Sequence, residues 1–223
     1  MELKVIAYAQ NGHTDKFGIP RQSRDESPIL TRIVFTPEYR VQEALRGIED
    51  FSHLWLLWGF SEVENRQSTI EGDWSPTVRP PRLGGNKRMG VFATRSPFRP
   101  NPIGLTSVRL LKVADGDLIV SGADLMDGTP IYDIKPYLSY SDSHPEAKCG
   151  FADEHKADRL AVIGERGDVP ETVWRDIVYI LEQDPRPAYQ DDPEREYKMD
   201  YAGYCVTFSV DGPMLRVRCI EKT

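Results

Sequence analysis

Short extended segments joined by turn residues, with almost no helical stretch between them, constrain the fold of this chain more than any other feature. Ser52–Phe60 (SHLWLLWGF) is too aromatic and too short for a typical helix, so it predicts a buried strand. Ser107–Val113 and Leu118–Ala123 flank Asp115-Gly116 and predict a hairpin. Because long helices do not separate these segments, we expect a closed or nearly closed β-sheet, mainly β with some α, rather than an alternating parallel α/β fold.

The remaining segments complete this picture. Further strands are expected at Leu3–Ala9, Arg32–Phe35, Val91–Thr94 and Pro130–Pro136. One or two helical turns are expected over Tyr39–Arg46, and a loop over Thr77–Gly90.

The composition changes after Tyr140, where a polar stretch begins. Pro170–Gln183 has the spacing of an amphipathic helix, and Tyr204–Val210 with Met214–Ile220 predicts a terminal hairpin. We therefore expect two domains, a larger one over residues 1–140 and a small α+β domain over residues 141–223.

Composition excludes several classes of protein. Hydrophobic residues make up 39% of the chain and charged residues 28%, which is typical of a globular protein. No apolar run approaches the ~20 residues of a membrane helix, and the N-terminus lacks the pattern of a secretory signal. The 3 cysteines are not in CxxC spacing, so we expect no disulfide framework and a cytoplasmic location.

Positive charge is concentrated in one stretch. Residues 74–114 contain no Asp or Glu but 8 Lys and Arg, so with a net charge of −7 for the whole chain the remainder carries −15. Such a basic island in an acidic protein indicates a local electrostatic site, although a solvated face paired with acids elsewhere is the alternative. Pro97, Pro100 and Pro102 stiffen the chain around Arg95 and Arg99. A rigid cationic surface of this kind suits a phosphate, a nucleotide or an RNA backbone.

Other common sites are not supported. No GxGxxG follows a strand, and Val91 follows the last glycine of the Gly84–Gly90 loop where a phosphate-binding loop needs Lys and then Ser or Thr. His144, Cys149 and His155 match no standard zinc spacing, so no metal is expected.

Several motifs together resemble one family. ATRSPFRPNPIG, with RPPRLGGNKRMGVFATRS running into it, closely resembles the hallmark of the TrmO (TsaA-like) tRNA methyltransferases. The blocks DLMDGTP and DIKPY, FGIPRQ near the N-terminus, and DPRPAY in the C-terminal part resemble further motifs of the bacterial members. Many bacterial members carry Phe-His-Gln where this chain has Phe60-Ser61-Glu62, so a ring contact at position 61 does not carry over, while backbone contacts there stay open.

The resemblance implies an activity and its setting. The expected catalytic domain is a single-sheeted β-barrel that binds S-adenosylmethionine, works as a homodimer and is unrelated to the Rossmann methyltransferases. The expected reaction is methylation of N6 of threonylcarbamoyl-adenosine at tRNA position 37, next to the anticodon, most of all in threonine tRNA.

Motif matching also assigns candidate residues. Cofactor contacts are expected at Pro20, Arg21, Gln22, Arg95, Leu105, Leu125, Asp127, Gly128 and Thr129. Cations available to tRNA are Arg82, Lys87, Arg88, Arg99 and Arg186. Phe98 or Tyr137 is a candidate contact for the target base.

The proton acceptor is less well defined by sequence. Asp133 and Lys135 share a face of an extended segment, as an exposed ion pair or as groups that steer or accept the amine proton. Two alternatives to the leading function stay open, namely a non-catalytic RNA- or nucleotide-binding module and a methyltransferase of the same fold with another acceptor.

Overall fold

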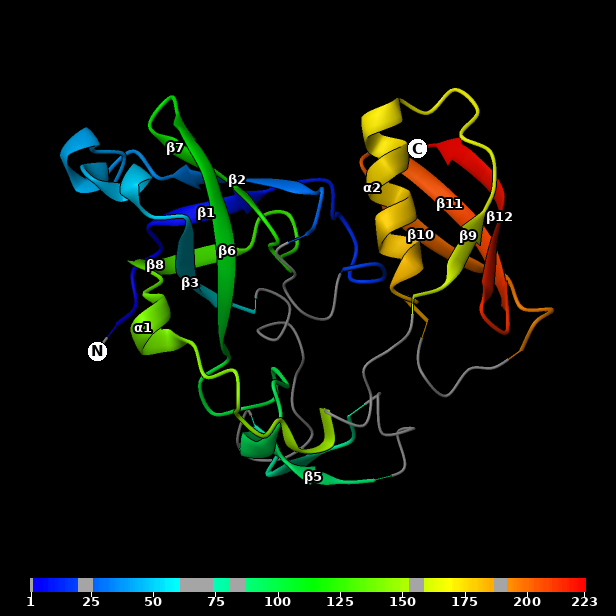
Figure 1. Ribbon diagram of the computed structural model, residues 1–223, viewed down its shortest axis with the longest axis horizontal. Helices are drawn as coiled ribbons and strands as arrows, with labels where there is room; N and C mark the ends of the chain where they lie inside the picture. Colours follow the sequence, from blue (N-terminus) through cyan, green and yellow to red (C-terminus); the bar gives the residue numbers. More distant parts are fainter. Residues whose placement is uncertain (1, 20–25, 61–73, 81–86, 153–158, 187–191) are drawn as a thin grey trace.

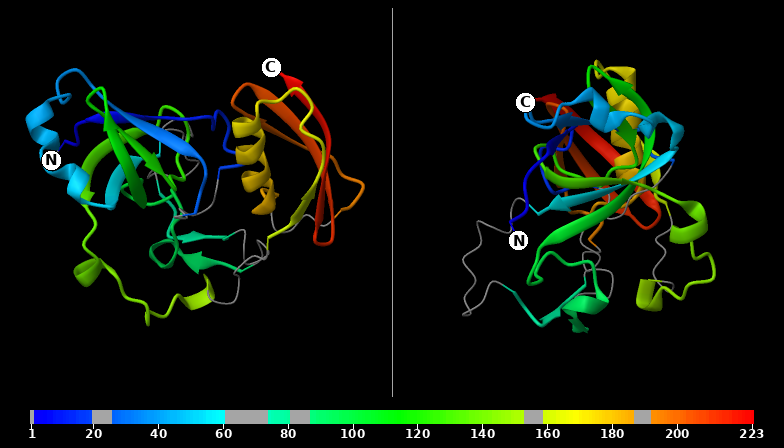
Figure 2. Two further views of the ribbon diagram at one scale, coloured as in Figure 1. Left: turned by 45° about the horizontal axis from the view of Figure 1, so that its top comes forward. Right: turned by 90° about the vertical axis from the view of Figure 1, so that its left-hand side faces the viewer.

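The protein, seen here as a computed structural model, has two β-rich units side by side. The structure describes residues 2–19, 26–60, 74–80, 87–152, 159–186 and 192–223. Figure 1 shows a barrel at the left and a sheet backed by one helix at the right, with strand β5 below them. The left view of Figure 2 shows the same pair of units, with the helix between the barrel and the second sheet.

Six antiparallel strands close the barrel in the order β1-β2-β7-β6-β3-β8, and β8 pairs back onto β1. The expected closed, mainly β architecture is therefore confirmed. The strands are β1 (Ala7–Gln10), β2 (Leu30–Phe35), β3 (His53–Gly59), β6 (Ile103–Ala114), β7 (Asp117–Ser121) and β8 (Pro130–Pro136).

Alternation along β3 explains why this aromatic segment forms a strand. Leu54, Leu56 and Trp58 point into the barrel core, whereas Trp55 and Leu57 lie on the outer face. β3 pairs with β6 on one side and with β8 on the other, so it occupies the middle of the sheet that carries the candidate site.

The second unit consists of β9 to β12 and the helix α2, and we call it the C-terminal domain. Its sheet has the order β10-β11-β12-β9, with a parallel pair between β12 and β9. The buried face of α2 packs on this sheet through Ile177, Ile180 and Leu181. Its elements are β9 (Ala161–Ile163), α2 (Glu171–Glu182), β10 (Tyr197–Tyr201), β11 (Tyr204–Asp211) and β12 (Met214–Lys222).

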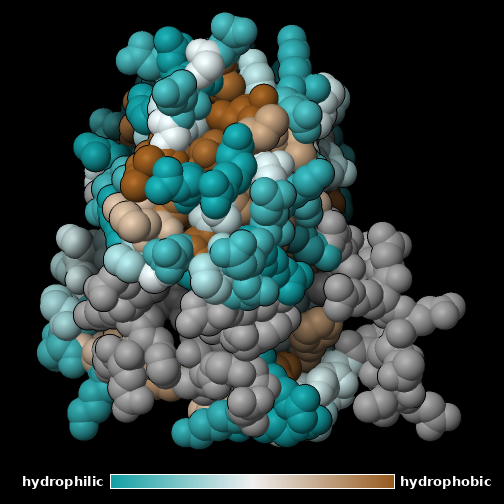
Figure 3. All heavy atoms as spheres, turned by 90° about the vertical axis from the view of Figure 1, so that its right-hand side faces the viewer, coloured by the Kyte–Doolittle hydropathy of each residue, from teal (hydrophilic) through white to brown (hydrophobic). Residues whose placement is uncertain are grey.

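The N-terminal part of the chain also packs against the C-terminal domain. Ile29 belongs to its buried core, and the ring of Phe17 stacks near Tyr197 and Phe208. In Figures 1 and 2 the chain that leaves β1 runs toward α2, between the two units. The opposite face of this domain, seen in Figure 3, shows apolar side chains gathered among hydrophilic ones in its upper part.

The expected hairpins and the helix over Pro170–Gln183 are confirmed, but some local predictions were wrong. Val91–Thr94 is not a strand, because η4 (Val91–Ala93) is a 3₁₀ turn that Thr94 closes through its N–H and hydroxyl, both bonded to the Val91 carbonyl. The expected loop over Thr77–Gly90 includes the short pair β4 (Thr77–Val78) and β5 (Met89–Gly90). The first strand begins at Ala7 rather than Leu3.

Four short helical elements complete the described structure. The helical turn expected over Tyr39–Arg46 is a 3₁₀ turn, and a second 3₁₀ turn follows Gly47. They are η1 (Gln42–Leu45), η2 (Ile48–Asp50), α1 (Ser139–Asp142) and η5 (Gly150–Ala152).

Candidate functional site

The Leu125–Thr129 turn, between β7 and β8, is held by strand β1. The N–H of Gly128 donates to the Ala9 carbonyl at 2.8 Å, and the N–H of Ala9 donates to the Thr129 carbonyl at 2.9 Å. The Thr129 hydroxyl donates to the Met126 carbonyl at 2.7 Å within the turn. The backbone of the turn is thus fixed before any ligand binds.

The barrel interior fixes the residue that precedes this turn. The indole N–H of Trp58 donates to Thr106 Oγ1 at 2.9 Å, and that hydroxyl donates to Asp124 Oδ1 at 2.7 Å. This short chain of hydrogen bonds ties β3 and β6 to the start of the turn.

Buried and exposed members of the turn have different roles. The side chains of Leu125 and Thr129 are buried and hold the turn in the barrel. Asp127 and Gly128 are exposed, and Gly128 has a φ of 76°, in the left-handed region that glycine adopts without cost. Of the residues assigned to cofactor binding in this turn, Asp127 and Gly128 are the ones that face outward.

Strand register brings two other candidate residues onto one face of the barrel. Leu57 of β3 pairs with Leu105 of β6 on one side and with Asp133 of β8 on the other. All three lie on the outer face, and Leu105 is 55% exposed. An exposed apolar side chain and a carboxylate are therefore displayed in one row across three strands.

Asp133 and Lys135 form the ion pair that alternation along the strand suggested. Lys135 Nζ lies 2.7 Å from Asp133 Oδ2, and the Ile134 N–H donates to Asp133 Oδ1 at 2.9 Å. Each carboxylate oxygen thus has one partner, and the lone pairs that remain can accept a further hydrogen bond or a proton.

We call residues 87–101 the arginine segment, and its backbone is held mainly by local bonds. Arg99 Nη1 donates to the Thr94 carbonyl at 3.1 Å and to the Ser96 carbonyl at 3.4 Å. The Ser96 N–H donates to Thr94 Oγ1, and the Phe98 N–H donates to Ser96 Oγ. Arg99 thus supports the segment, whereas Arg95 is exposed.

Cations and aromatic rings share the surface around this segment. Lys87 and Arg88 are exposed, and Arg88 donates to Thr77 Oγ1 at 2.8 Å. Phe92 is 73% exposed and stacks on Trp74, with ring centroids 6.2 Å apart. Positive charge beside exposed aromatic faces is a common combination in surfaces that bind single-stranded nucleic acid.

The other predicted site residues fall in two groups. Arg186, expected to be displayed between prolines, is 9% exposed and donates from Nε and Nη2 to the two carboxylate oxygens of Asp184, at 2.8 and 2.9 Å. Its role as a tRNA contact stays a prediction. Pro20, Arg21, Gln22 and Arg82 lie outside the described residues.

Sequence reasoning missed Asn11 and His13. Asn11 bonds to the Leu125–Thr129 turn through its backbone N–H and its side-chain amide. His13 is 1% exposed, and burial lowers the pKa of its imidazole from 6.5 to about 4. Both residues lie in an irregular polar stretch of sequence that gives no signal of such contacts.

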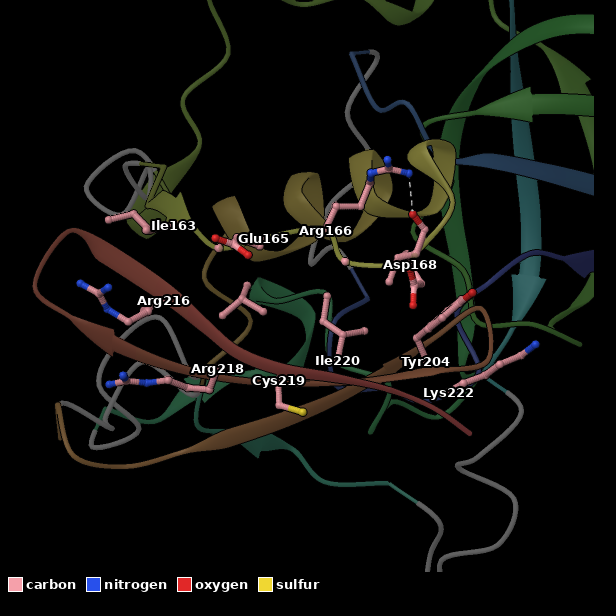
Figure 4. Close-up of a pocket in the computed structure, with 14 residues that line it drawn as sticks. Ile163, Glu165, Arg166, Asp168, Tyr204, Arg216, Arg218, Cys219, Ile220 and Lys222 are labelled. Carbon is pink, nitrogen blue, oxygen red and sulfur yellow. Dashed lines mark hydrogen bonds between the residues drawn. The ribbon is translucent and has the colours of Figure 1, made fainter.

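A separate hollow lies on the C-terminal domain, along the edge of β12 beyond β9. Its volume is about 1030 Å³, and its walls are the loop over residues 164–169 and the second half of β12. Figure 4 shows that Arg216 and Arg218 point to one side and Lys222 to the other. The charged groups diverge, so this hollow presents no convergent catalytic or anion-binding set.

Neither a metal-binding cluster nor a membrane-spanning helix occurs among the described residues. No group of three or more His, Cys, Asp or Glu side chains that could hold a metal ion was found in that part of the chain. Within the same residues, no helix is both long and apolar enough to span a bilayer.

In comparisons with known proteins, both parts of the chain match domains of one family. Residues 8–143 match the family model described as tRNA-methyltransferase O N-terminal domain, and residues 164–223 match the TrmO C-terminal domain. The tRNA (adenine(37)-N6)-methyltransferase of Escherichia coli K12 is 40% identical over 206 residues, which cover 86% of this chain and 85% of that protein.

Two further comparisons agree. A Pseudomonas aeruginosa protein, whose name describes an S-adenosylmethionine-dependent methyltransferase, is 41% identical over 207 residues, covering 87% of this chain and 86% of that protein. A crystal structure of TrmO from P. aeruginosa superposes with a TM-score of 0.78 at 30% identity, covering 100% of this chain and 97% of that one.

Proposed function

This chain belongs to the TrmO family of S-adenosylmethionine-dependent tRNA (adenine(37)-N6)-methyltransferases, and from this premise we propose its acceptor, site and assembly. The match over residues 8–143, together with the closed barrel, is the observation that carries the function. The enzyme uses S-adenosylmethionine as methyl donor. The acceptor we propose is N6 of threonylcarbamoyl-adenosine at position 37 of threonine tRNA.

The exposed residues of the candidate site fit the donor's chemistry. Its adenine needs an apolar face such as Leu105, its ribose hydroxyls need an acceptor such as the Asp127 carboxylate, and its own carboxylate needs a cation such as Arg95. Gly128 leaves open space at the turn, since a Cβ built there would meet nothing within 4 Å. We assign Leu125 and Thr129 to holding the turn, and Pro20, Arg21 and Gln22 to the same site by motif.

Methyl transfer demands alignment of donor and acceptor and exclusion of water. The donor supplies a methyl group on a sulfonium, which leaves by in-line displacement. The residues of the turn and of the β6–β3–β8 face orient the two reactants. The acceptor amine loses a proton, and we assign Asp133, held by Lys135, to steering that proton away from N6.

The acceptor and the tRNA backbone need cations. Threonylcarbamoyl-adenosine carries a carboxylate, and Lys87 and Arg88 are exposed cations without an acidic residue in their stretch of sequence. We assign these two, with Arg82, to the acceptor carboxylate and the anticodon-loop phosphates. Arg99 supports the loop that displays Arg95, and Arg186 contributes to tRNA binding only if it leaves Asp184.

The target base needs a stacking partner. Phe98 is exposed, whereas Tyr137 packs against Trp55 and His53 with ring centroids 5.4 and 6.1 Å away. We therefore favour Phe98 for this contact.

We also propose that two copies associate. Large apolar side chains in the arginine segment and at the start of β6 are exposed, among them Phe92, Phe98 and Ile103. Such a concentration is typical of an interface between subunits. Light scattering should give the mass of a dimer for the wild type and of a monomer for Phe92→Asp, and a monomeric wild type would contradict the assembly.

The domain division at residues 140 and 141 and a cytoplasmic location complete the proposal. The two family matches end at 143 and begin at 164, which supports a boundary in this region. Modification of tRNA next to the anticodon supports the location.

The decisive experiment supplies the proposed acceptor directly. The protein is incubated with S-adenosylmethionine and threonine tRNA that carries threonylcarbamoyl-adenosine, and the nucleosides are then weighed after digestion. A gain of one methyl group on that nucleoside is expected. Methylation of unmodified adenosine at position 37 instead would keep the enzyme class and overturn the proposed acceptor.

A further inference from the structure

Asn11 is bonded to the Leu125–Thr129 turn at two points. Its backbone N–H donates to Asp127 Oδ1 at 3.0 Å, and its side-chain Nδ2 donates to the Leu125 carbonyl at 3.0 Å. Nδ2 also donates to Thr31 Oγ1 at 3.2 Å, while Oδ1 accepts from the His13 N–H at 2.9 Å. The residue therefore fixes both the direction of the Asp127 carboxylate and the start of the turn.

The next two residues contact the C-terminal domain. The N–H of Ala202 donates to the Gly12 carbonyl at 2.9 Å, and the buried His13 ring packs edge-on against Tyr201 at 5.1 Å between centroids. The Tyr201 hydroxyl in turn donates to Asp176 of α2 at 3.1 Å. His13 also bonds back to the turn, because its carbonyl accepts from the Asp127 N–H at 2.8 Å.

We propose that Asn11 is a positioning residue for the methyl donor and that the C-terminal domain acts on the donor site through residues 11–13. The inference rests on the proposed assignment of the Leu125–Thr129 turn to donor binding. Asp127 is exposed, and the backbone N–H of Asn11 holds one of its carboxylate oxygens, which orients the other oxygen toward a ligand. A shift of residues 11–13 therefore moves the Asp127 carboxylate, which we assign to the ribose hydroxyls of S-adenosylmethionine. Residues 11–13 have this effect without contacting S-adenosylmethionine themselves.

Asn11→Asp keeps the backbone bond to Asp127 but replaces the side-chain NH2 group that bonds to Leu125 with a negatively charged oxygen. The carboxylate keeps an oxygen for the His13 N–H but places a second oxygen against the Leu125 carbonyl. We expect binding of S-adenosylmethionine, measured by calorimetry, to weaken about tenfold, with kcat at saturating donor within about threefold of wild type. Asn11→Ala removes the bond to Leu125 without adding charge and also removes the acceptor of the His13 N–H, so it should weaken binding at least as much.

Thr31→Val is the matched control, because it removes one acceptor of Asn11 and leaves the bond to Leu125 intact. It should change donor affinity by less than about twofold. Unchanged donor binding in folded Asn11→Asp and Asn11→Ala would overturn the inference. So would an equal loss in Thr31→Val, since the cause would then be barrel packing.

A pair of glycine variants tests the link to the C-terminal domain. A Cβ at Gly12 would lie 2.8 Å from Tyr201 Cζ, so Gly12→Ala pushes the two units apart at this point. A Cβ at Gly164 would lie 2.7 Å from Val217 Cβ, so Gly164→Ala strains the same domain elsewhere. We expect Gly12→Ala to weaken donor binding about threefold or more and Gly164→Ala to leave it unchanged, although both lower Tm.

Equal donor affinities of the two glycine variants would overturn the role of the C-terminal domain. Failure of the proposed function is distinguishable from failure of this inference. In the first case the wild-type protein itself does not bind the donor or does not methylate tRNA, whereas in the second the wild type does both and the Asn11 variants do so equally well.

Discussion

The Leu125–Thr129 turn and the arginine segment are both rigid, but for different reasons. The turn is fixed by residues far away in the sequence, since Asn11 and Asp127 are 116 residues apart. The arginine segment is fixed by its own prolines and by hydroxyl bonds over two or three residues, such as those of Thr94 and Ser96. Apart from Arg99, which bonds back to the segment, its charged and aromatic side chains are exposed.

This difference matches two kinds of ligand. A turn held by the fold can present fixed polar groups to a small molecule, which loses little of its binding energy to ordering the protein. A locally stiffened, cationic loop can display side chains to a large partner whose own surface completes the site. We therefore expect changes in the turn to alter donor binding, and changes in the arginine segment to alter tRNA binding and transfer.

Arg95 should give the largest effect, because it belongs to the arginine segment but is assigned to the donor carboxylate. Loss of a charge-assisted pair costs up to about 3 kcal/mol, so Arg95→Ala should lower methyl transfer about 100-fold with little change in Tm. Arg109→Ala, another exposed arginine of the basic island on β6, is the control and should leave transfer unchanged. Unchanged turnover in Arg95→Ala would remove this residue from the site.

The second-largest effect should be that of salt, which should weaken tRNA binding much more than binding of the methyl donor. If about four phosphates are contacted, raising monovalent salt from about 50 to 200 mM should weaken tRNA binding about 50-fold. Donor binding in the turn should change by less than about twofold, since it depends on few screened charges. Filter binding of tRNA and calorimetry with the donor measure both quantities on one preparation, and equal salt dependence of the two would contradict the division.

The sequence predicted the elements whose causes are local. The hairpin at Asp115-Gly116 forms because both residues adopt positive φ, 53° and 76°, which the Asp-Gly pair favours. The short aromatic run Ser52–Phe60 predicted a buried strand, and β3 forms there. The strand predicted over Val91–Thr94 was wrong. Its apolar residues are typical of a strand, but the hydroxyl of Thr94 closes a turn instead.

Contacts between distant parts of the chain could not be predicted. Nothing in the stretch around Asn11 signals that one face of it bonds to Asp127 and the next residues to Ala202. Arg186 was expected to be displayed because prolines flank it, but Asp184 two residues earlier holds its guanidinium. The sequence identified candidate site residues that belong to motifs. The residues that position them could be identified only from the structure.

Acid should lower the stability of the protein through the buried His13, which bonds to the Leu125–Thr129 turn. Burial lowers the pKa of His13 to about 4 from 6.5, so the folded state resists protonation that the unfolded chain accepts. Above pH 6.5, the neutral His13 makes its full contribution to the free energy of unfolding. This contribution is lost as the pH falls from 6.5 toward 4, and the loss at pH 5 is about 2 kcal/mol. Residues 74–114 contain no Asp, Glu or His, so the basic island has no corresponding group.

His13→Phe tests this effect, because the ring keeps its packing against Tyr201 but cannot be protonated. Urea unfolding at pH 8 and pH 5 should show a smaller acid loss in the variant than in the wild type, by about 2 kcal/mol. An identical loss in both proteins would assign the acid sensitivity to other groups.

The smallest effect should come from the turn's backbone alone. Gly128 has a φ of 76° and open space where a Cβ would lie, so Gly128→Ala adds no clash and costs only the left-handed conformation, about 1 kcal/mol. If the donor needs this conformation, its affinity should fall about fivefold while tRNA affinity stays the same. Gly47→Ala is the matched control, since Gly47 has a φ of 83° with equally open space but lies beside η2. The two variants should lose similar stability, and only Gly128→Ala should lose donor affinity, because only there does the strained backbone belong to the turn that presents Asp127.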